Sequence, residues 1–552
     1  MHQLVNLSKH SRYRPLVLVI IPLALSSFTH LWNPLGFPAG TSYDEGIYLR
    51  RAMHVLNGLG PQENQNFYDH PYFSQLFIAA FFWSIGYPVS TTPSSEDIDS
   101  IETLYMIPRL LMGTLAVFDT FLIYLIAQRR YNSRNVAFAT AMLFAGMPLT
   151  SLLLRRVWLE PIQLPFILLS ILFALWLQKS YNNETRITND DAIKGSQSKG
   201  NGKSMTISPM HFYKKRRRTS RKAILFTTFS GAFLGMATFT KVPAFTFIPL
   251  LGFLIYNKNS GRDRKTLFFL WLVPLLAIVM IWPVYAFSVG DISEWTQGIF
   301  WQANREGRDL FYSLQYDLTI DPVLLILGGA GLIYAILRKD LFILFWIIPF
   351  FIFLYLIGFV SFWHLIPALP AFCIAIARMI DEVCHMVIRG AFFKEIIPLL
   401  VILALVTAET AYIAPSIIGG SNQNIFSTVT ILTDYLKKEN NRIQEEASEH
   451  QKTVTVIGDP SYLWIPQYVF NLDNFDYKTY SGDPPDASKR TILVVDQALV
   501  RALSIDTETS KVLQKMYSSN NTKTIVTVGD NGPLSSQVSI LSYDPLFLQI
   551  PS

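Results

Sequence analysis

Charged side chains that could do chemistry are rare in this chain, and they gather in short segments between long apolar runs. The best marked is segment 42–46, Ser-Tyr-Asp-Glu-Gly, in which Asp44 and Glu45 follow the first apolar run. Two adjacent carboxylates can supply a general base together with a ligand for a cation or a hydroxyl. The segment also suits a helix start, with Ser42 or Asp44 as the cap and Glu45 at the positive end of a helix over 46–57. Both interpretations can hold together.

A second acidic segment lies in the same loop, where Asp69 and His70 precede Pro71. Asp and His side chains together can bind a divalent metal or a phosphate. The alternative is an ordinary turn before a proline-started helix. The sequence therefore allows a metal site at Asp69 and His70 without requiring one.

The basic candidates stand between later apolar runs. Arg155 and Arg156 suit the phosphate of a lipid, and Glu160 follows them at the start of the next run. Arginines that reach along a helix end to water, with Glu160 in the first helical turn, explain the same pattern. Lys241 is isolated in an apolar hairpin, where it either binds a phosphate or reaches water at the outer face. His364, at the start of a late apolar run, suits a structural role as well as a site.

The elements that must position these side chains are membrane helices. The chain has 552 residues, of which 51% are hydrophobic and 16% charged, where a soluble protein carries roughly 25% charged residues. A helix of about 20 apolar residues crosses a bilayer. We expect eleven spans, near 16–32, 105–128, 136–153, 161–178, 223–240, 243–257, 267–288, 322–337, 341–360, 364–380 and 396–414.

The distribution of Lys and Arg predicts the orientation of these spans. The loops richest in Lys and Arg are 9–14, 129–134, 214–218, 258–265, 338–339 and 389–394. Basic loops stay on the cytoplasmic side, so we expect a multi-pass protein of the cell membrane with a cytoplasmic N-terminus. This placement explains the net charge of +6 without a nucleic-acid partner. All the candidate segments then share the outer face, where a charge near a membrane end is costly unless it is paired or functional.

The chain divides into two predicted domains. Residues 1–419 form the helical membrane domain, with an outer loop at 33–104 and a cytoplasmic basic loop at 179–222. Residues 420–552 change character: a helical pattern over 426–436 precedes strand-like runs at 453–457, 491–495, 524–528 and 538–541. Alternating short strands and helices predict a small extracytoplasmic α/β domain. The fold class is therefore mainly α, a polytopic bundle with a small C-terminal α/β domain.

The loop 289–321 lies on the predicted outer side and holds aromatic and basic residues at helical spacing. These are Trp295, Trp301, Arg305, Arg308 and Tyr312. Amphipathic stretches of this kind lie in the membrane interface. Simple anchoring explains the pattern, and covering a lipid-binding groove is the alternative use.

The order of these segments resembles the GT-C superfamily of polytopic glycosyltransferases. It is most similar to the group that contains the protein O-mannosyltransferases and the lipid A aminoarabinose transferase. The resemblance covers about residues 16–380 and rests on six elements in order. They are Asp44-Glu45, Asp69-His70-Pro71, Arg109-Leu110-Leu111, the stretch from Arg155 to Glu160, the stretch from Thr240 to Pro243, and Pro367-Ala368-Leu369-Pro370. The chain departs from the family where Tyr72 replaces a second proline, where Glu160 replaces an aspartate, and where His364 replaces a basic residue.

The resemblance implies a chemistry for the outer face. The donor is a polyprenyl-phosphate monosaccharide, and the acceptor is a hydroxyl of a protein, a lipid or a glycan. Asp44 acts as the base in one inverting displacement, with Glu45 and Glu160 as further catalytic carboxylates. The donor phosphate is bound by Lys241, Arg155, Arg156, Arg109 and His364. A divalent cation held by Asp69 and His70 is the one cofactor that the pattern allows.

Two other functions fit a polytopic membrane protein. A transporter or flippase of lipid-linked sugars places its functional charges near the membrane centre and often shows inverted repeats. In this chain the charges gather at one face, and no internal repeat is visible. An outward-facing binding protein that uses the C-terminal domain makes the outer clusters incidental. The pattern favours the transferase over both.

Overall fold

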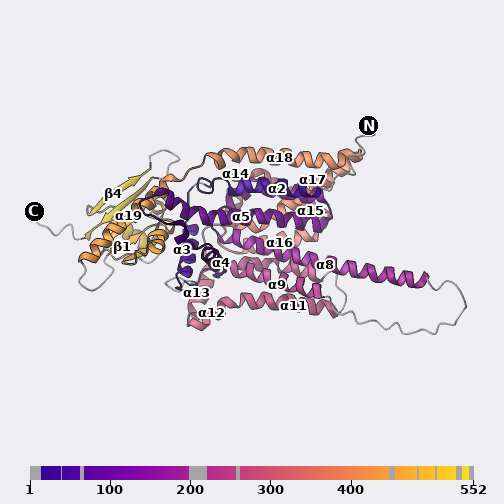
Figure 1. Ribbon diagram of the computed structural model, residues 1–552, viewed down its shortest axis with the longest axis horizontal. Coiled ribbons are helices and arrows are strands. Elements are labelled where there is room, and N and C mark those ends of the chain that lie inside the picture. The colour runs from indigo at the N-terminus through magenta and orange to yellow at the C-terminus, as the bar shows by residue number, and fades with distance from the viewer. Residues whose placement is uncertain are drawn as a thin grey trace, which may run out of the picture.

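The computed structural model describes residues 14–545, apart from 39, 63–67, 198–220, 257–261, 447–453, 481–483, 504–506 and 530–536. A long bundle of helices is joined at one end to a small α/β domain (Figure 1). The predicted basic positions 9–12, 214–218 and 258 lie outside the described residues.

Each of the eleven predicted spans falls on a helix or on two consecutive helices. They are α2 (Arg14–Leu31), α5 (Ile98–Tyr131), α6 (Arg134–Gly146) with α7 (Pro148–Leu153), α8 (Leu159–Gln197), α9 (Arg221–Thr240), η3 (Val242–Phe247) with α10 (Ile248–Tyr256), α11 (Arg262–Val279) with α12 (Ile281–Val289), α15 (Pro322–Leu337), α16 (Leu341–Leu356), η4 (Phe362–Ala368) with α17 (Leu369–Val387), and α18 (Ala391–Gly419). Among the described residues, six helical segments are long and apolar enough to cross a membrane, and shorter apolar helices accompany them. The prediction of a helical membrane bundle is confirmed.

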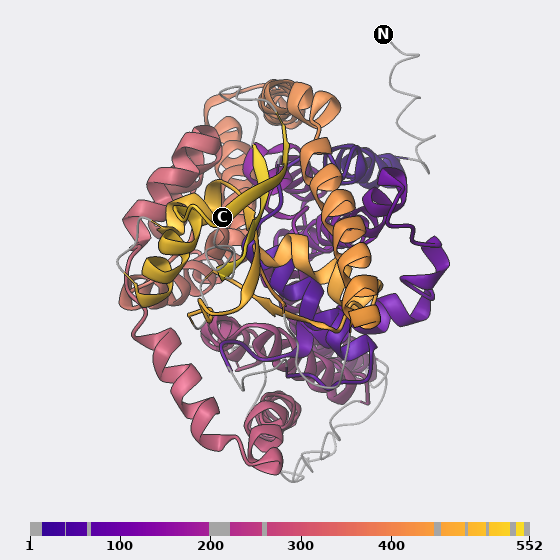
Figure 2. The same cartoon turned by 90° about the vertical axis from the view of Figure 1, so that its left-hand side faces the viewer.

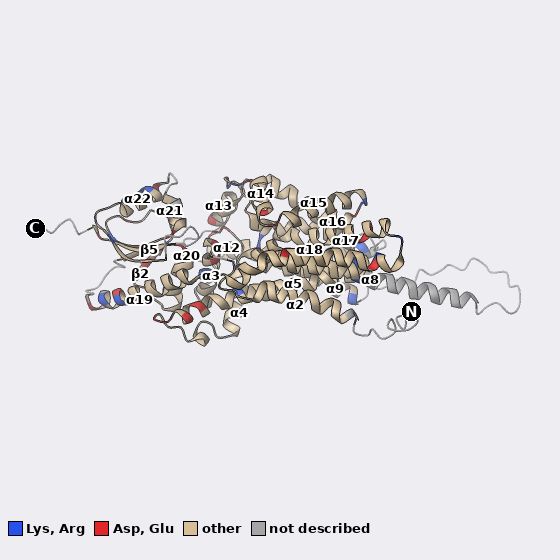
Figure 3. Ribbon diagram, turned by 90° about the horizontal axis from the view of Figure 1, so that it is seen from above, with Lys and Arg blue, Asp and Glu red and all other residues tan. Residues whose placement is uncertain are grey.

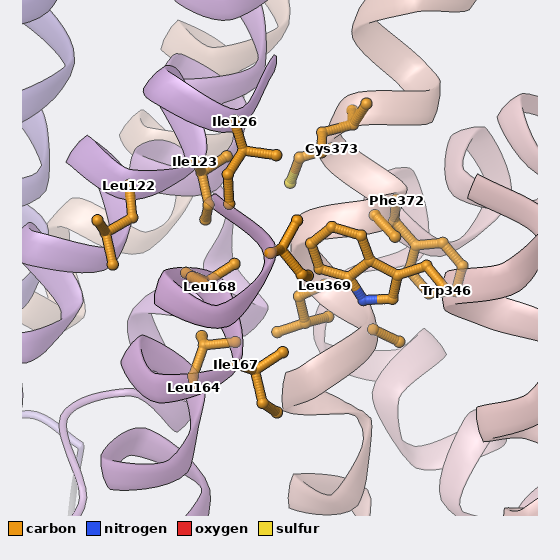
Figure 4. Packing of buried hydrophobic residues seen from close by; sticks show 14 of the residues in the cluster. Leu122, Ile123, Ile126, Leu164, Ile167, Leu168, Trp346, Leu369, Phe372 and Cys373 are labelled. Atoms are coloured by element: carbon orange, nitrogen blue, oxygen red, sulfur yellow. The ribbon is translucent and has the colours of Figure 1, made fainter. Parts of the chain in front are cut away.

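Charged residues are scarce along the bundle and concentrate towards its two ends (Figure 3). Its interior is packed by apolar side chains from distant parts of the chain. Figure 4 shows residues of α5 and α8 facing residues of α16 and α17, namely Leu122, Ile123, Ile126, Leu164, Ile167, Leu168, Trp346, Leu369, Phe372 and Cys373. Close packing of this kind holds membrane helices together, since the lipid is as apolar as the side chains.

Four helices lie outside the spans, at the end of the bundle next to the C-terminal domain (Figure 1). They are α3 (Tyr43–Leu56), α4 (Phe73–Ser84), α13 (Ile292–Ala303) and α14 (Leu310–Ile320), and the single turn η2 (Val89–Thr91) accompanies them. The predicted helix over 46–57 begins earlier, at Tyr43, because the Ser42 side chain accepts a hydrogen bond from the Glu45 N–H at 3.2 Å. Ser42 is therefore the helix cap, which leaves the Asp44 carboxylate available for other contacts.

The C-terminal domain holds α19 (Gln423–Glu446), β1 (Val454–Ile457), α20 (Pro460–Trp464), η5 (Ile465–Val469), β2 (Phe475–Lys478), β3 (Arg490–Val495), α21 (Gln497–Leu503), α22 (Glu508–Tyr517), β4 (Thr522–Val528) and β5 (Val538–Tyr543). The strand order is β2-β1-β3-β5-β4; β1 is parallel to β2 and β3, and β5 is antiparallel to β3 and β4. The four predicted strands are present. Strand β2 was missed because its sequence, Phe-Asp-Tyr-Lys, has no apolar run. Seen from this end, the sheet lies in front of the outer helices (Figure 2).

Candidate active site

Asp44 lies in the first turn of α3 and is half-buried. No residue in the described part of the chain forms a hydrogen bond or close ion pair with its carboxylate. Burial raises the pKa of Asp44 to about 6; Lys241 and Arg305 oppose this rise, while Glu160 and Asp69 add to it. Four side chains from four separate segments therefore act on one carboxylate that is free to accept a proton.

Next to Asp44 stands a buried ion pair between the Lys241 ammonium and the Glu160 carboxylate. Glu160 lies in the first turn of α8, and Lys241 is the N-terminal cap of η3. The Gln163 side-chain amide donates a 2.6 Å hydrogen bond to the Lys241 carbonyl. His364 places Nε2 3.8 Å from Glu160 Oε1. The Ser361 N–H donates to His364 Nδ1 at 2.8 Å, so the neutral ring carries its proton on Nε2, facing Glu160.

Asp69 belongs to the same site, but its carboxylate is already contacted by Arg51 and by the backbone of His70. Arg51 of α3 forms an ion pair with Asp69 at 2.9 Å, and the His70 N–H donates to the same oxygen at 2.9 Å. Burial raises the pKa of Asp69, yet Arg51 and His70 outweigh it, so the pKa is below its ordinary value. Burial lowers the pKa of His70 to about 3, which keeps the ring neutral near pH 7.

The arrangement of Asp69 and His70 does not fit a divalent cation. Arg51 occupies the Asp69 oxygen that a cation would need. Among the described residues, no three His, Cys, Asp or Glu side chains gather as metal ligands. The predicted metal role of Asp69 and His70 gains no support from the geometry.

Glu45 has a different environment from its neighbour Asp44. Its carboxylate is buried and accepts two hydrogen bonds from the Arg109 guanidinium, at 2.8 and 2.9 Å, while Arg156 lies 3.8 Å away. Burial raises the pKa of Glu45, but the two arginines more than offset it, and the pKa falls below its ordinary value. Glu45 is therefore a permanently charged partner of Arg109 and not a second base.

The predicted phosphate-binding arginines serve the outer loop instead. Arg109 donates to the carbonyls of Pro34 and Gly40 at 3.1 and 2.9 Å. Arg155 donates to the carbonyls of Thr29, Trp32 and Asn33 and lies 5.0 Å over the Phe37 ring, and Arg156 donates to Gly40 at 3.3 Å. We therefore reassign Arg109, Arg155 and Arg156. They were predicted to bind the donor phosphate, but their contacts hold the loop before α3 in place.

Arg305 was missed as a site residue by sequence reasoning. It follows α13 and is half-buried, with its guanidinium 3.7 Å over the Phe359 ring and 5.0 Å over Trp301. No described residue forms a hydrogen bond or ion pair with this guanidinium. Burial lowers the pKa of Arg305, while Asp44 and Asp69 raise it, so its charge faces both carboxylates. Sequence reasoning placed Arg305 only in an aromatic and basic stretch, because residues of these types at this spacing also suit an interfacial helix.

Comparison with known proteins supports the predicted resemblance. Residues 62–189 match a family described as dolichyl-phosphate-mannose-protein mannosyltransferase. The oligosaccharyltransferase AglB of Archaeoglobus fulgidus, solved with an inhibitory peptide and a dolichol-phosphate, is similar to this chain with a TM-score of 0.55 and 13% identity, over 88% of this chain and 69% of that one. ArnT of Cupriavidus metallidurans, solved with undecaprenyl phosphate, is similar with a TM-score of 0.52 and 13% identity, over 95% and 97% of the two chains. This chain therefore has the fold of AglB and ArnT, and part of it matches the mannosyltransferase family.

The family match covers only part of the site. Residues 62–189 include Asp69, Arg109 and Glu160 but neither Asp44 nor Lys241. The similarity to AglB and ArnT concerns the fold, since the identities are low. No curated protein sequence matches this chain significantly. Roles for individual residues therefore come from the geometry of this chain.

Proposed function

We propose that this protein is a GT-C glycosyltransferase, which moves a monosaccharide from a polyprenyl-phosphate donor to an acceptor hydroxyl on the outer face of the membrane. The observation that carries the proposal is the free Asp44 carboxylate, which faces the Lys241 and Arg305 cations. A base and a phosphate-binding cation within one site are what a displacement at the anomeric carbon requires. The dolichol-phosphate bound to AglB and the undecaprenyl phosphate bound to ArnT support the donor class.

Asp44 is the base in this mechanism. It takes the proton from the acceptor hydroxyl while the oxygen attacks the anomeric carbon, and the bond to the lipid phosphate breaks. One displacement of this kind inverts the anomeric configuration. Negative charge develops on the departing phosphate, where Arg305 and Lys241 stabilise it and His364 offers its Nε2–H. Glu160 holds Lys241 in place through the buried ion pair.

The orientation in the membrane follows from the end of the bundle opposite the site. That end carries basic side chains, including Arg130, which forms an ion pair with Asp340 at 3.1 Å, and Arg338, which forms one with Glu382 at 2.6 Å. We assign this end to the cytoplasm by the positive-inside rule. The active site and the C-terminal domain then lie outside, where a lipid-linked donor is delivered.

The direct test uses the purified full-length protein in lipid nanodiscs. It is incubated with a panel of radiolabelled polyprenyl-phosphate monosaccharides and with protein, lipid and glycan acceptors. We expect label to appear covalently on one acceptor class, with inverted anomeric configuration. Movement of the intact donor across a bilayer, without covalent transfer to any acceptor, would favour a flippase and contradict the proposal.

The raised pKa of Asp44 predicts an acidic limb in the rate–pH profile. The base must be unprotonated, and its pKa of about 6 means that the active form is lost as pH falls through that value. We expect kcat/KM to be level near neutral pH and to fall about tenfold per pH unit below about pH 6, because kcat/KM reports the pKa of the free enzyme. Transfer rates at substrate concentrations well below KM measure this, and a profile that stays flat to about pH 4.5 would contradict the assignment.

Arg305→Gln is expected to weaken donor binding, because the guanidinium is the cation of the site that no described carboxylate neutralises. A charge-assisted contact is worth about 1.5–3 kcal/mol, so the donor KM should rise by about 10- to 100-fold. Arg308→Gln is the matched control, because Arg308 is exposed in the same loop and its guanidinium lies 5.8 Å over the Phe359 ring. Equal effects of the two changes would indicate general surface attraction rather than a phosphate contact.

A further inference from the structure

One edge of the C-terminal sheet faces the helix that carries Asp44. Asp459 follows β1, Tyr480 follows β2 and Asp496 follows β3, so all three mark the carboxyl ends of parallel strands. Strands β2 and β3 lie on opposite sides of β1. Such a reversal of strand order opens a crevice at the carboxyl ends, which in open α/β sheets holds a ligand.

In this chain the start of α3 lies against the segments that follow β1 and β2. Helix α20, which follows β1, packs directly on α3. The closest approach is at Gly46, where a Cβ atom would lie 2.5 Å from the carbonyl carbon of Pro460 and closer still to the backbone nitrogen of Ser461. Because these obstacles are backbone atoms, no side-chain rotation can make room for a larger residue at position 46.

Hydrogen bonds fix Ser461 in this position. Its hydroxyl oxygen accepts from Thr41 Oγ1 at 3.0 Å, and its carbonyl accepts from the Tyr105 hydroxyl. Its N–H donates to Asp459 at 2.8 Å, and the Tyr480 hydroxyl donates to the same carboxylate at 3.4 Å. The segment before α3, the span α5 and the C-terminal sheet therefore meet at one buried residue.

A ring contact between the C-terminal domain and α3 involves the residue beside Asp44. The Tyr480 ring lies 5.3 Å from the ring of Tyr43, the first residue of α3. The contacts at Tyr43 and Gly46 thus flank Asp44 on both sides along the helix. A displacement of this first turn would move Asp44 relative to Lys241 and Arg305, which belong to other elements.

We propose that the C-terminal domain is part of the active site as a positioning element, with Gly46 and Ser461 as the seat that sets the position of Asp44. This inference rests on the proposed function, in which Asp44 is the base. Misplacement of a reacting group by about 1 Å can cost about 100-fold in rate, so the seat controls kcat rather than donor affinity.

Gly46→Ala in the full-length protein tests the seat. We expect kcat to fall by about 100-fold, the donor KM to stay within about twofold, and the midpoint of the acidic limb to move, because Asp44 leaves its present surroundings. Gly252→Ala is the control: it places the same methyl group in α10, where nothing lies within 4 Å, and should leave kcat unchanged. A variant with wild-type kcat and an unmoved acidic limb overturns the proposal.

A milder pair of variants keeps the proposal testable if Gly46→Ala fails to fold. Thr41→Val removes the hydrogen bond to Ser461 with little change of shape, and Thr41→Ser retains it. We expect kcat to fall several-fold in the first, to recover in the second, and the donor KM to stay constant in both. Equal kcat values for the two variants would overturn the proposal that Ser461 positions Asp44. Asp44→Asn separates the two hypotheses: if it is inactive while the seat variants behave as wild type, the proposed function stands and the positioning role is wrong.

Discussion

Asp44→Asn is expected to lower kcat by about 1,000-fold or more, while the protein folds and binds its donor. The amide has nearly the shape of the carboxylate but cannot accept a proton, and general base catalysis contributes about 100- to 10,000-fold. Folding should be unaffected, because the helix cap is supplied by Ser42 and no described residue bonds to the Asp44 carboxylate. The pKa of the native carboxyl is raised to about 6 because burial outweighs its attraction to Lys241 and Arg305, so replacing it by a neutral amide should cost little stability.

The measurement is the rate of transfer by purified protein at saturating donor and acceptor, together with the thermal unfolding midpoint. Glu294→Gln is a suitable control, because Glu294 is a partly exposed acidic residue of α13, at the same end of the bundle as Asp44. That variant should keep the native rate. Near-native transfer by Asp44→Asn would show that another group takes the proton, and the site would have to be reassigned.

Arg109→Met is expected to have the second large effect, on stability. The change leaves the buried Glu45 carboxylate with Arg156, 3.8 Å away, and removes the hydrogen bonds to the Pro34 and Gly40 carbonyls. Removing one partner of a buried ion pair costs about 3–5 kcal/mol, because the remaining charge is left uncompensated. The thermal unfolding midpoint in nanodiscs, with and without donor, measures the loss.

The double variant Glu45→Gln/Arg109→Met separates this structural role from the phosphate-binding role that the family pattern predicts. Neutralising Glu45 as well should recover part of the lost stability, which a double-mutant cycle quantifies. If Arg109→Met instead leaves the unfolding midpoint unchanged and raises the donor KM, Arg109 returns to the phosphate site. These two results can be told apart, because a structural role lowers the unfolding midpoint of the donor-free protein, whereas a phosphate-binding role raises the donor KM.

The ion pair between Glu45 and Arg109 explains why a motif pattern can place residues correctly and still misassign their roles. Asp44 and Glu45 are adjacent, so the sequence treats them as one acidic pair. On a helix they point about 100° apart. Glu45 consequently meets the arginines of the bundle, whereas Asp44 faces Lys241 and Arg305. The two neighbouring carboxylates therefore have different roles, because different residues surround each one.

The sequence by itself determined the features that depend on local physics. Long apolar runs specify the membrane helices, because a polar backbone can cross lipid only in a hydrogen-bonded helix. The serine at position 42 specifies the start of α3, and four of the five strands follow from β-branched runs in the C-terminal segment. The ordered motifs also indicated a resemblance to the GT-C class and the region of the site, since they lie near one predicted face of the membrane, in loops between the predicted spans or near the ends of those spans.

The tertiary structure decided what depends on contacts between distant segments. It paired Lys241 with Glu160, turned Arg155 towards the carbonyls of the outer loop, and brought Arg305 over Phe359 beside Asp44. It also showed that Gly46 is required for contact with the C-terminal domain and not for turn geometry. Such partners are set by the packing of whole helices and of the sheet against them, and residue type and spacing along one segment carry no information about them.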